Sequence, residues 1–424
     1  MKSTMHRIRK IIQLLLLSGV LFAFAMFQGG FVSWFLFYSV VPLLIYMLSI
    51  PFYPFNKWRV NRVLSSKYGQ AGGSVLITIT LERKIPFPLF YLVVEENSPT
   101  TLNYQDIGQG KYKYLNDQQF YVENRVFRKL LFPLFKRKLT VTFRVANLPR
   151  GQHSFHSINV QTGDPFGLIS NQYVWEIEDS LVVYPAVRSL EWKQRMDSNE
   201  AGANPVLLHD HKQANVVSGV REYIPGDRFS WIDWKTTARK NSIMTKEFEQ
   251  EKDAHMAIVL SAELKSSMQQ LSFEALVELA ASILVSTRKK GQSVSFHMLG
   301  EAEKHFTEQQ VKFEPTVIQN YLALINPDKK DSLFTSKLVT SLNHLPKGSL
   351  LLCITSQLDQ KLVDSLVIKS KQDLQIALYS IISKNDYTSF HQSLIESLRM
   401  HRISVQILSE DDLKKVRWEV NASL

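Results

Sequence analysis

The chain has 424 residues, enough for two or three domains that each bury a core of their own. Its formal net charge of +11 favours anionic partners such as lipid headgroups or nucleic acid. The single cysteine, Cys353, excludes an internal disulfide framework and a cysteine-cluster metal site, and the apolar run 350–354 around it predicts a buried thiol on a strand.

Two apolar runs at the N-terminus predict a transmembrane helical hairpin within residues 1–56. Residues 11–27 and 31–50 carry no charge, and each run is close to the ~20 residues that a helix needs to cross the hydrocarbon layer. Pro42 is expected to kink the second helix. Both flanks are basic and the turn is uncharged, so the positive-inside rule predicts a multi-pass protein of the plasma membrane with its soluble domains in the cytoplasm. The flanking cations are Lys2, Arg7, Arg9, Lys10, Lys57, Arg59, Arg62 and Lys67.

Two other interpretations of these runs are open. Ala23-Phe24-Ala25 resembles the cleavage site of a secretory signal peptide. Even after such a cleavage, the second run would return the chain to the cytoplasm, so the location of the soluble part would not change. The other interpretation is a buried helical pair in a globular core, although two adjacent uncharged runs of this length are unusual in soluble domains.

Residues 57–188 have the pattern of an antiparallel, Ig-like β-sandwich. Polar and apolar residues alternate along runs such as 74–80 and 139–145, and turn signals between the runs indicate roughly seven short strands. Residues 125–138 interleave cations with apolar side chains, as suits the surface of an anionic leaflet. We expect a hairpin tip here, although strand ends with a solvated basic turn explain the pattern equally well. The membrane-surface candidates are Arg128, Lys129, Lys136, Arg137 and Lys138.

The pattern changes after a linker and a motif-rich segment, together residues 189–253, of which 190–215 are polar and expected to form a loop. Residues 254–424 alternate apolar strands with amphipathic helices, which implies a parallel sheet covered on both faces. Gly291 is placed to end the first of these helices. Strands are expected at 256–260, 294–299, 350–355, 374–382 and 404–408, and helices at 272–290, 360–370, near 389–400 and at the end of the chain.

Residues 219–249 carry a dense motif, which we call the signature segment. It reads GVREYIPGDR over 219–228, IDWKTTAR over 232–239 and KEFE over 246–249, and it is accompanied by Arg150-Gly151 and by DPFGL over 164–168. These elements resemble the signature of a bacterial family, domain of unknown function 58. Its YeaD-like members are membrane proteins with a von Willebrand-A-like α/β domain of Rossmann type. The resemblance extends over essentially the whole chain.

The resemblance implies a partner rather than a reaction. Family members look like membrane-anchored proteins that are often paired with a MoxR-type AAA+ ATPase and sometimes with a transglutaminase-like membrane protein. No enzymatic activity and no cofactor are implied. We therefore expect a non-enzymatic scaffold or adaptor that presents a von Willebrand-A-like domain in the cytoplasm. Nucleic acid is not expected as a partner, because the chain contains no recognised binding module.

Three roles are open for the signature segment. In the structural role, arginines pair with aspartates and the tryptophan packs, so that the segment is pinned between domains. In the docking role, Arg and Trp form an interface hot spot. In the third, an uncharacterised hydrolase is centred on Asp227 and Asp233. We assign Arg221, Tyr223, Gly226, Asp227, Asp233, Trp234 and Arg239 to structure, and Arg228 and Lys235 to docking.

The metal site of a von Willebrand-A-like domain is degenerate in this sequence. Such a site needs D-x-S-x-S after the first strand, because Mg²⁺ prefers hard oxygen ligands. Ser261 stands in place of the aspartate, Glu263 in place of the first serine, and Ser356 in place of an aspartate after a later strand. We expect no metal, with a metal-dependent ligand-binding module centred on Glu263 as the alternative. His209-Asp210-His211 lacks a third ligand, and no P-loop, nucleophile elbow or H-E-x-x-H motif is present.

Overall fold

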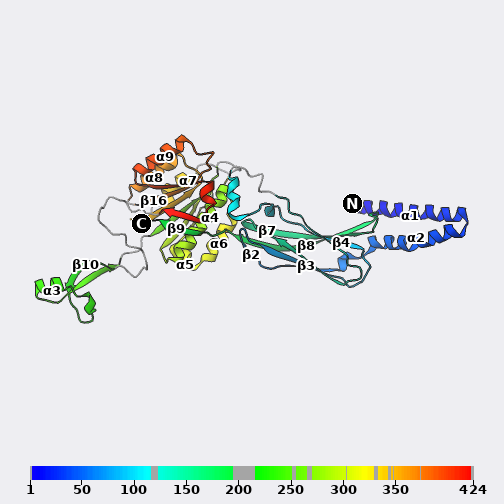
Figure 1. Cartoon of the computed structure of the whole chain (residues 1–424), viewed down its shortest axis with the longest axis horizontal. Helices are drawn as coiled ribbons and strands as arrows, with labels where there is room; N and C mark the ends of the chain where they lie inside the picture. Colours follow the sequence, from blue (N-terminus) through cyan, green and yellow to red (C-terminus); the bar gives the residue numbers. More distant parts are fainter. Residues whose placement is uncertain are drawn as a thin grey trace.

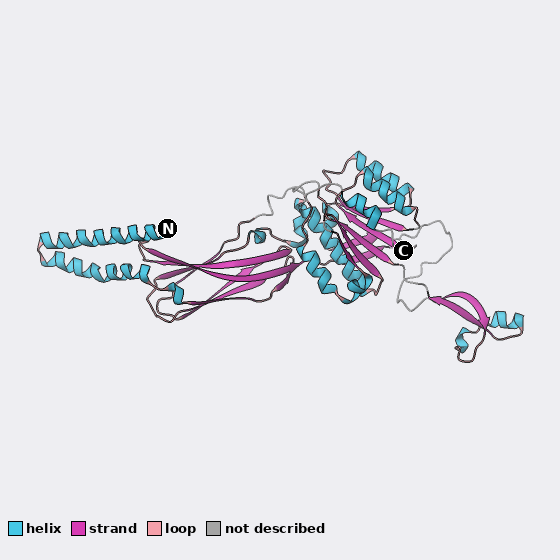
Figure 2. Cartoon of the chain, turned by 180° about the vertical axis from the view of Figure 1, so that it is seen from behind, coloured by secondary structure: helices cyan, strands magenta, loops and turns pink. Residues whose placement is uncertain are grey.

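The computed structural model describes residues 2–115, 123–193, 215–250, 255–264, 270–301, 303–328, 333–341, 345–346, 348–372 and 374–421. It is a mixed α+β structure with an N-terminal helix pair, a region of two β-sheets, an α/β region and the segment 215–250 (Figure 1). The helix pair and the segment 215–250 lie at opposite ends of the molecule in both Figure 1 and Figure 2.

The N-terminal helices run side by side in opposite directions. Helix α1 spans Lys2–Gln28 and α2 spans Phe31–Ser49, and the turn between them places Gly29 at φ +58°, which glycine adopts without strain. Both helices are long and apolar enough to cross a membrane, and most of their side chains are exposed. A third helix of that length and composition, α4 (Gln270–Lys289), is largely buried in the α/β region and is therefore a core helix.

A three-stranded and a five-stranded sheet enclose one core between the helix pair and the α/β region. Their strand orders are β1-β3-β6 and β2-β8-β7-β4-β5, with antiparallel neighbours except for the parallel pair β2–β8. Every second residue of β3 and β6 is buried between the sheets, which explains the alternating pattern of the sequence. The strands are β1 (Arg59–Leu64), β2 (Tyr68–Gln70), β3 (Val75–Glu82), β4 (Tyr91–Glu96), β5 (Phe127–Leu131), β6 (Lys138–Val145), β7 (Gly151–Gly163) and β8 (Ser170–Tyr184).

The basic stretch 125–138 is not a hairpin tip, so that prediction is wrong. Strand β5 pairs with β4, whereas β6 pairs with β3 in the other sheet. The residues between β5 and β6 therefore cross from one sheet to the other. Two consecutive strands joined by a short connection usually form a hairpin. Here each strand pairs with a different strand that is distant in the sequence, so no hairpin forms.

The α/β region is built on a six-stranded sheet with the order β14-β13-β12-β15-β16-β17. Neighbouring strands are parallel except for β14, which runs antiparallel to β13 at one edge. The strands are β12 (Met256–Ser261), β13 (Val294–Leu299), β14 (Lys304–Phe306), β15 (Leu350–Thr355), β16 (Gln375–Ile381) and β17 (Ser404–Leu408). Besides α4, the helices are α5 (Glu308–Phe313), α6 (Pro315–Leu324), α7 (Leu333–Ser341), α8 (Gln360–Ser370), α9 (Ser389–Met400) and α10 (Glu410–Leu413).

The two faces of this sheet bury separate cores. On β12, Ile258 and Leu260 pack with α4, α5 and α6, whereas Ala257 and Val259 pack with α7, α8 and α9. Cys353 lies on the second face and is buried, which confirms the predicted strand thiol; burial raises its pKa to about 12. Such a thiol is protonated and unreactive at neutral pH.

The end of the chain differs from the prediction of a closing helix. Helix α10 is only one turn long, and β18 (Arg417–Asn421) follows it. Strand β18 pairs in parallel with β9 (Ser189–Lys193), in a stretch that was predicted to be a linker. Trp418 and Val420 are buried in the core on the α4 side, so long-range packing makes a strand of a segment whose local pattern is too short to decide.

Candidate functional site

The signature segment folds as a small unit held by bonds between its own residues. Strands β10 (Asn215–Glu222) and β11 (Met244–Gln250) pair antiparallel, and η6 (Phe229–Trp231) and α3 (Trp234–Lys240) lie between them. The guanidinium of Arg221 donates to both carboxylate oxygens of Asp227, at 2.7 and 2.8 Å. That fork lowers the pKa of Asp227 and raises the pKa of Arg221. It closes the turn in which Gly226 adopts φ +117°.

Asp233 begins α3 as its N-terminal cap. Its carboxylate accepts hydrogen bonds from the backbone N–H groups of Lys235 and Thr236, both at 3.1 Å. The hydroxyl of Thr237 accepts from the backbone of Met244 at 3.0 Å, which ties the helix to β11. Asp233 therefore holds the start of α3 in place.

The outer face of the segment is open to solvent. Trp234 is 69% exposed and Phe229 is 76% exposed, while Tyr223 is half-buried and stacks on Phe229. Arg228 and Lys235 are exposed, as the docking assignment requires, and the guanidinium of Arg228 lies 5.4 Å from the centre of the Trp231 ring.

Two of the side chains assigned to structure, those of Trp234 and Arg239, are exposed. Arg239 is exposed and has no ion-pair partner among the residues that the structure describes, and Trp234 is exposed beside it. The prediction that Trp234 packs and Arg239 pairs to hold the structure is therefore wrong. The physical reason is that α3 spans only Trp234–Lys240 and, in Figure 1, lies away from the two-sheet region and the α/β region, so neither of these described regions covers its outer face.

The geometry gives little support to a hydrolytic centre at Asp227 and Asp233. Asp227 is held in the guanidinium fork of Arg221, and Asp233 binds the first N–H groups of α3. A carboxylate whose pKa is lowered by an arginine is a weak general base, because its proton affinity is reduced.

A buried ionic network lies elsewhere, between the two-sheet region and α4. Lys111 is 2.7 Å from a carboxylate oxygen of Asp106 and 3.1 Å from one of Glu278. Arg188 and the hydroxyl of Tyr112 also donate to Glu278. Burial by itself raises the pKa of Glu278, but Lys111 and Arg188 outweigh burial and hold it below its ordinary value. We call these five residues the ionic lock.

Arg150 makes a second connection between the same regions. Its guanidinium forks onto Glu274 of α4, with both N···O distances 2.8 Å. It also donates to the backbone carbonyls of Leu322 (2.6 Å), Ala323 (3.2 Å) and Ile325 (2.8 Å), which satisfies the end of α6. Sequence reasoning noted Arg150 only as part of a turn motif, because its partners lie more than a hundred positions away.

The three residues of the degenerate metal site do meet, at the carboxyl ends of β12 and β15. The hydroxyl of Ser356 donates to the backbone carbonyl of Glu263 at 3.2 Å, and the Glu263 backbone N–H donates to Ser261 at 3.3 Å. The Glu263 carboxylate accepts from the backbone of Phe334 at 2.7 Å, at the start of α7. Within the described ranges no three His, Cys, Asp or Glu side chains cluster as metal ligands. His209-Asp210-His211 lies outside the described residues.

The comparisons with known proteins agree with the signature. Residues 219–387 match the family described as "Protein of unknown function DUF58". The "Uncharacterized protein YeaD" of Bacillus subtilis (strain 168) is 34% identical over 327 residues, which are 76% of this chain and 76% of the relative. The chain belongs to the DUF58 family. The family match begins within β10 and includes the whole signature segment.

Similarity to solved structures is weak. The PilB minor pilin from Streptococcus sanguinis aligns over 77% of this chain and 85% of its own, at 6% identity and a TM-score of 0.27. The alkylpurine DNA glycosylase AlkC from Pseudomonas fluorescens aligns over 30% of each chain, at 12% identity and a TM-score of 0.19. Neither similarity supports a conclusion about the DUF58 fold or function.

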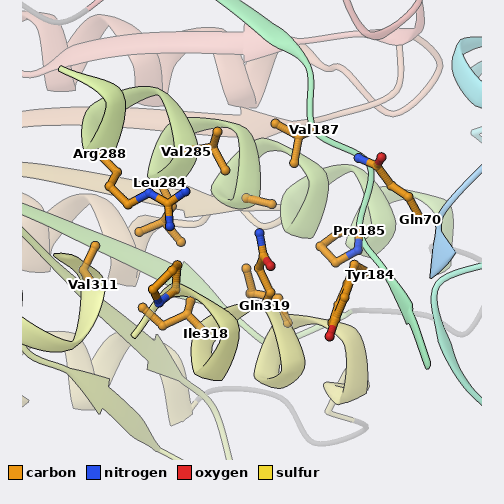
Figure 3. A pocket seen from close by; sticks show the side chains of 13 residues that line it. Gln70, Tyr184, Pro185, Val187, Leu284, Val285, Arg288, Val311, Ile318 and Gln319 are labelled. Atoms are coloured by element: carbon orange, nitrogen blue, oxygen red, sulfur yellow. The ribbon is translucent and has the colours of Figure 1, made fainter. Parts of the chain in front are cut away.

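A cleft of about 220 Å³ lies where the two-sheet region of this DUF58 protein meets α4, α5 and α6 (Figure 3). Tyr184 and Gln70 approach it from the strands, and Leu284 and Ile318 line it from the helices. Tyr184 also donates to the side chain of Asn320 at 2.9 Å, which helps to join the two regions. The lining is mostly apolar and brings no acid–base pair together.

The membrane-surface candidates are exposed but do not form one cluster. Arg128 on β5 pairs with Glu95 at 2.9 Å, and Lys138 on β6 pairs with Glu82 at 2.9 Å. Lys129, Lys136 and Arg137 are exposed on β5 and on the connection to β6. Arg128 and Lys129 thus lie along a strand, whereas the other three lie at or next to the crossing between the sheets.

Proposed function

We propose that this DUF58 protein is a membrane-anchored, non-enzymatic scaffold that presents its signature segment in the cytoplasm to a MoxR-type AAA+ ATPase. One observation carries the proposal: the segment exposes Phe229 and Trp234 together with cations, although aromatic side chains are normally buried. Aromatic residues and arginine are the side chains that contribute most to protein–protein interfaces.

The segment can expose these residues because local bonds maintain its fold. The Arg221–Asp227 fork, the Asp233 cap and the β10–β11 ladder use none of the outer side chains. The outer face carries the cations Arg228, Lys235, Arg239 and Lys240, all exposed. A matching partner surface has an apolar groove with acidic residues along its rim.

The other parts of the chain suit a rigid presenting role. The helix pair anchors the chain, and its basic flanks favour both ends in the cytoplasm. The ionic lock and Arg150 then fix the α/β region to the two-sheet region. A reporter fused after Leu424 tests the orientation: activity of a reporter that works only in the periplasm would refute it.

We assign the α/β region to the von Willebrand-A-like class and the two-sheet region to the Ig-like class. The strand order of the six-stranded sheet, numbered along the chain, is 3-2-1-4-5-6, and this doubly wound order supports the first assignment. The place where such a sheet binds ligands is the switch point between β12 and β15, where Ser261 and Ser356 lie. Serines in place of aspartates support a domain that works without Mg²⁺.

The docking role is tested by capture of a purified MoxR-type ATPase of the same organism on the detergent-solubilised full chain. We expect Trp234→Ala and Arg228→Ala each to reduce capture at least several-fold. Arg399→Ala and Met400→Ala, on the exposed end of α9, serve as matched controls and should capture as the wild type does. Equal capture by all four variants would remove the signature segment as the docking site.

A further inference from the structure

Three connections of the two-sheet region end beside the base of the helix pair. They are 83–90 between β3 and β4, 132–137 between β5 and β6, and 164–169 between β7 and β8. The hydroxyl of Tyr46, in the last turn of α2, accepts a hydrogen bond from the backbone of Phe90 at 3.3 Å. Ile169 packs with Met47 and Ile50 at the end of the same helix. These connections therefore lie at the level where the second apolar run ends.

The tips of these connections expose large apolar side chains. Each of the residues concerned is between 47% and 73% exposed. Single exposed apolar residues are common on soluble proteins, but many on adjacent loops mark a binding surface. Phe90 and Phe132 touch across two of the connections, with ring centres 6.3 Å apart. Phe52, directly after α2, is exposed beside them. We call these residues together the apolar collar: Phe52, Ile85, Phe90, Phe132, Leu134, Phe135, Phe166 and Leu168.

Buried polar side chains hold the collar in place. Arg83 is buried, and its guanidinium donates to the backbone carbonyls of Phe87 (2.7 Å), Leu134 (2.5 Å) and Lys136 (2.6 Å), which joins two of the connections. In the third, the buried carboxylate of Asp164 accepts from the backbone N–H groups of Phe166 (2.9 Å) and Ile169. The DPFGL turn is thus built to direct Phe166 and Leu168 outward.

The exposed charged side chains on or beside these connections are mainly cations. Lys57, Lys84, Lys136 and Arg137 are exposed on or beside the same connections. The acidic groups at this end are engaged, because Glu82 pairs with Lys138 and Asp164 is buried. Apolar side chains framed by cations match the boundary between anionic headgroups and acyl chains.

We propose that the apolar collar inserts into the headgroup–acyl boundary of an anionic bilayer around the base of the helix pair. The inference rests on the proposed membrane anchoring, and it adds that the two-sheet region is seated on the membrane rather than tethered loosely to it. The occupant follows from continuity with the two apolar helices and from the charge. Seated in this way, the 15 residues of β8 hold the α/β region about 50 Å from the bilayer, at about 3.3 Å per residue.

The test labels one introduced, solvent-accessible cysteine in the full chain. Phe135→Cys and Phe166→Cys place a thiol on the collar, and Val126→Cys places one at the opposite end of β5 as a control of similar exposure. The native Cys353 is buried and does not compete for the label. Each variant carries a polarity-sensitive fluorophore and is reconstituted into vesicles of phosphatidylcholine and phosphatidylglycerol with quencher-labelled acyl chains.

We expect several-fold stronger quenching at positions 135 and 166 than at 126, with a blue-shifted emission. Equal quenching at all three positions overturns the collar, as does shielding that grows with the protein-to-lipid ratio, because a second copy would then cover it. Flotation of the same vesicles separates this failure from that of the anchoring. Protein that floats without quenching refutes only the collar, whereas protein that does not float refutes the membrane anchoring on which it rests.

Discussion

Arg150 and Arg221 each grip a carboxylate with two hydrogen bonds of 2.7–2.8 Å, yet the two ion pairs differ in almost everything else. The side chain of Arg150 is 4% exposed, and its partner Glu274 is 124 positions away on α4. The side chain of Arg221 is 36% exposed, and its partner Asp227 is six positions away in the same turn. The first pair joins two regions of the molecule, and the second closes one loop.

The geometry of an ion pair alone therefore does not reveal its role. Charges that are removed from water must be matched, and loss of one partner leaves the other unsatisfied. Charges at the surface remain hydrated whether or not they pair. The ionic lock and Arg150 therefore belong to the stability of the chain, while the exposed residues of the signature segment are free to serve recognition. The predictions below test this division.

The largest expected effect follows Glu278→Gln. This change keeps the shape of the side chain but leaves Lys111 and Arg188 with too little negative charge in a buried site, at a cost of ~3–5 kcal/mol in the free energy of unfolding. Urea unfolding of the full chain in detergent measures it. Glu191→Gln, which breaks an exposed pair with Arg417, is the control and should cost below ~0.5 kcal/mol. Equal losses would contradict the division.

Arg150→Lys should have the next largest effect. Lysine keeps the charge but cannot form the fork with Glu274 and also bind the three carbonyls near the end of α6, so we expect a loss of ~1.5–3 kcal/mol. Arg128→Lys, at an exposed pair with Glu95, is the matched control. Hydrogen exchange should also show α6 opening more readily in Arg150→Lys. Unchanged protection of α6 would argue against the role of Arg150 in fixing the end of this helix.

A smaller, pH-dependent effect is expected at the β13–β14 edge. Burial, reinforced by His305 and His255, lowers the pKa of His297 to about 4. The unfolded chain then binds the proton more readily than the folded one, so stability is full above pH ~6.5 and falls as the pH drops towards ~4. The full shift corresponds to about 3 kcal/mol, and the partial exposure of the His297 side chain reduces the expected loss to ~1–2 kcal/mol. His297→Gln should flatten this part of the profile. An unchanged slope would show that other groups cause it.

The smallest effects on stability are expected in the signature segment. Phe229→Ala, Trp234→Ala and Arg239→Ala remove exposed side chains, so each should change the free energy of unfolding by less than ~0.5 kcal/mol. Thermal melts of the full chain measure this. A loss of more than ~2 kcal/mol in the free energy of unfolding for any of the three would show that the segment is covered, and would give that residue a structural role.

Four features could be predicted from the sequence alone: the two apolar helices, the family, the buried strand thiol of Cys353, and most strands and helices of the α/β region. These features depend on local composition and on periods of 2 and 3.6 residues, which a sequence displays directly. It also indicated that arginines of the signature segment pair with its aspartates, because these residues are close together in the chain.

Which charges are buried and which aromatic residues are exposed follows only from the tertiary structure. Glu278 is matched by Lys111 and Arg188, each some ninety positions or more away in the chain, and no local pattern predicts that meeting. The same holds for β18 beside β9 and for the crossing from β5 to β6. Trp234 and Arg239 are assigned to structure from the sequence, but burial depends on what packs against a helix, and within the described part of the chain no other region packs against the outer face of α3.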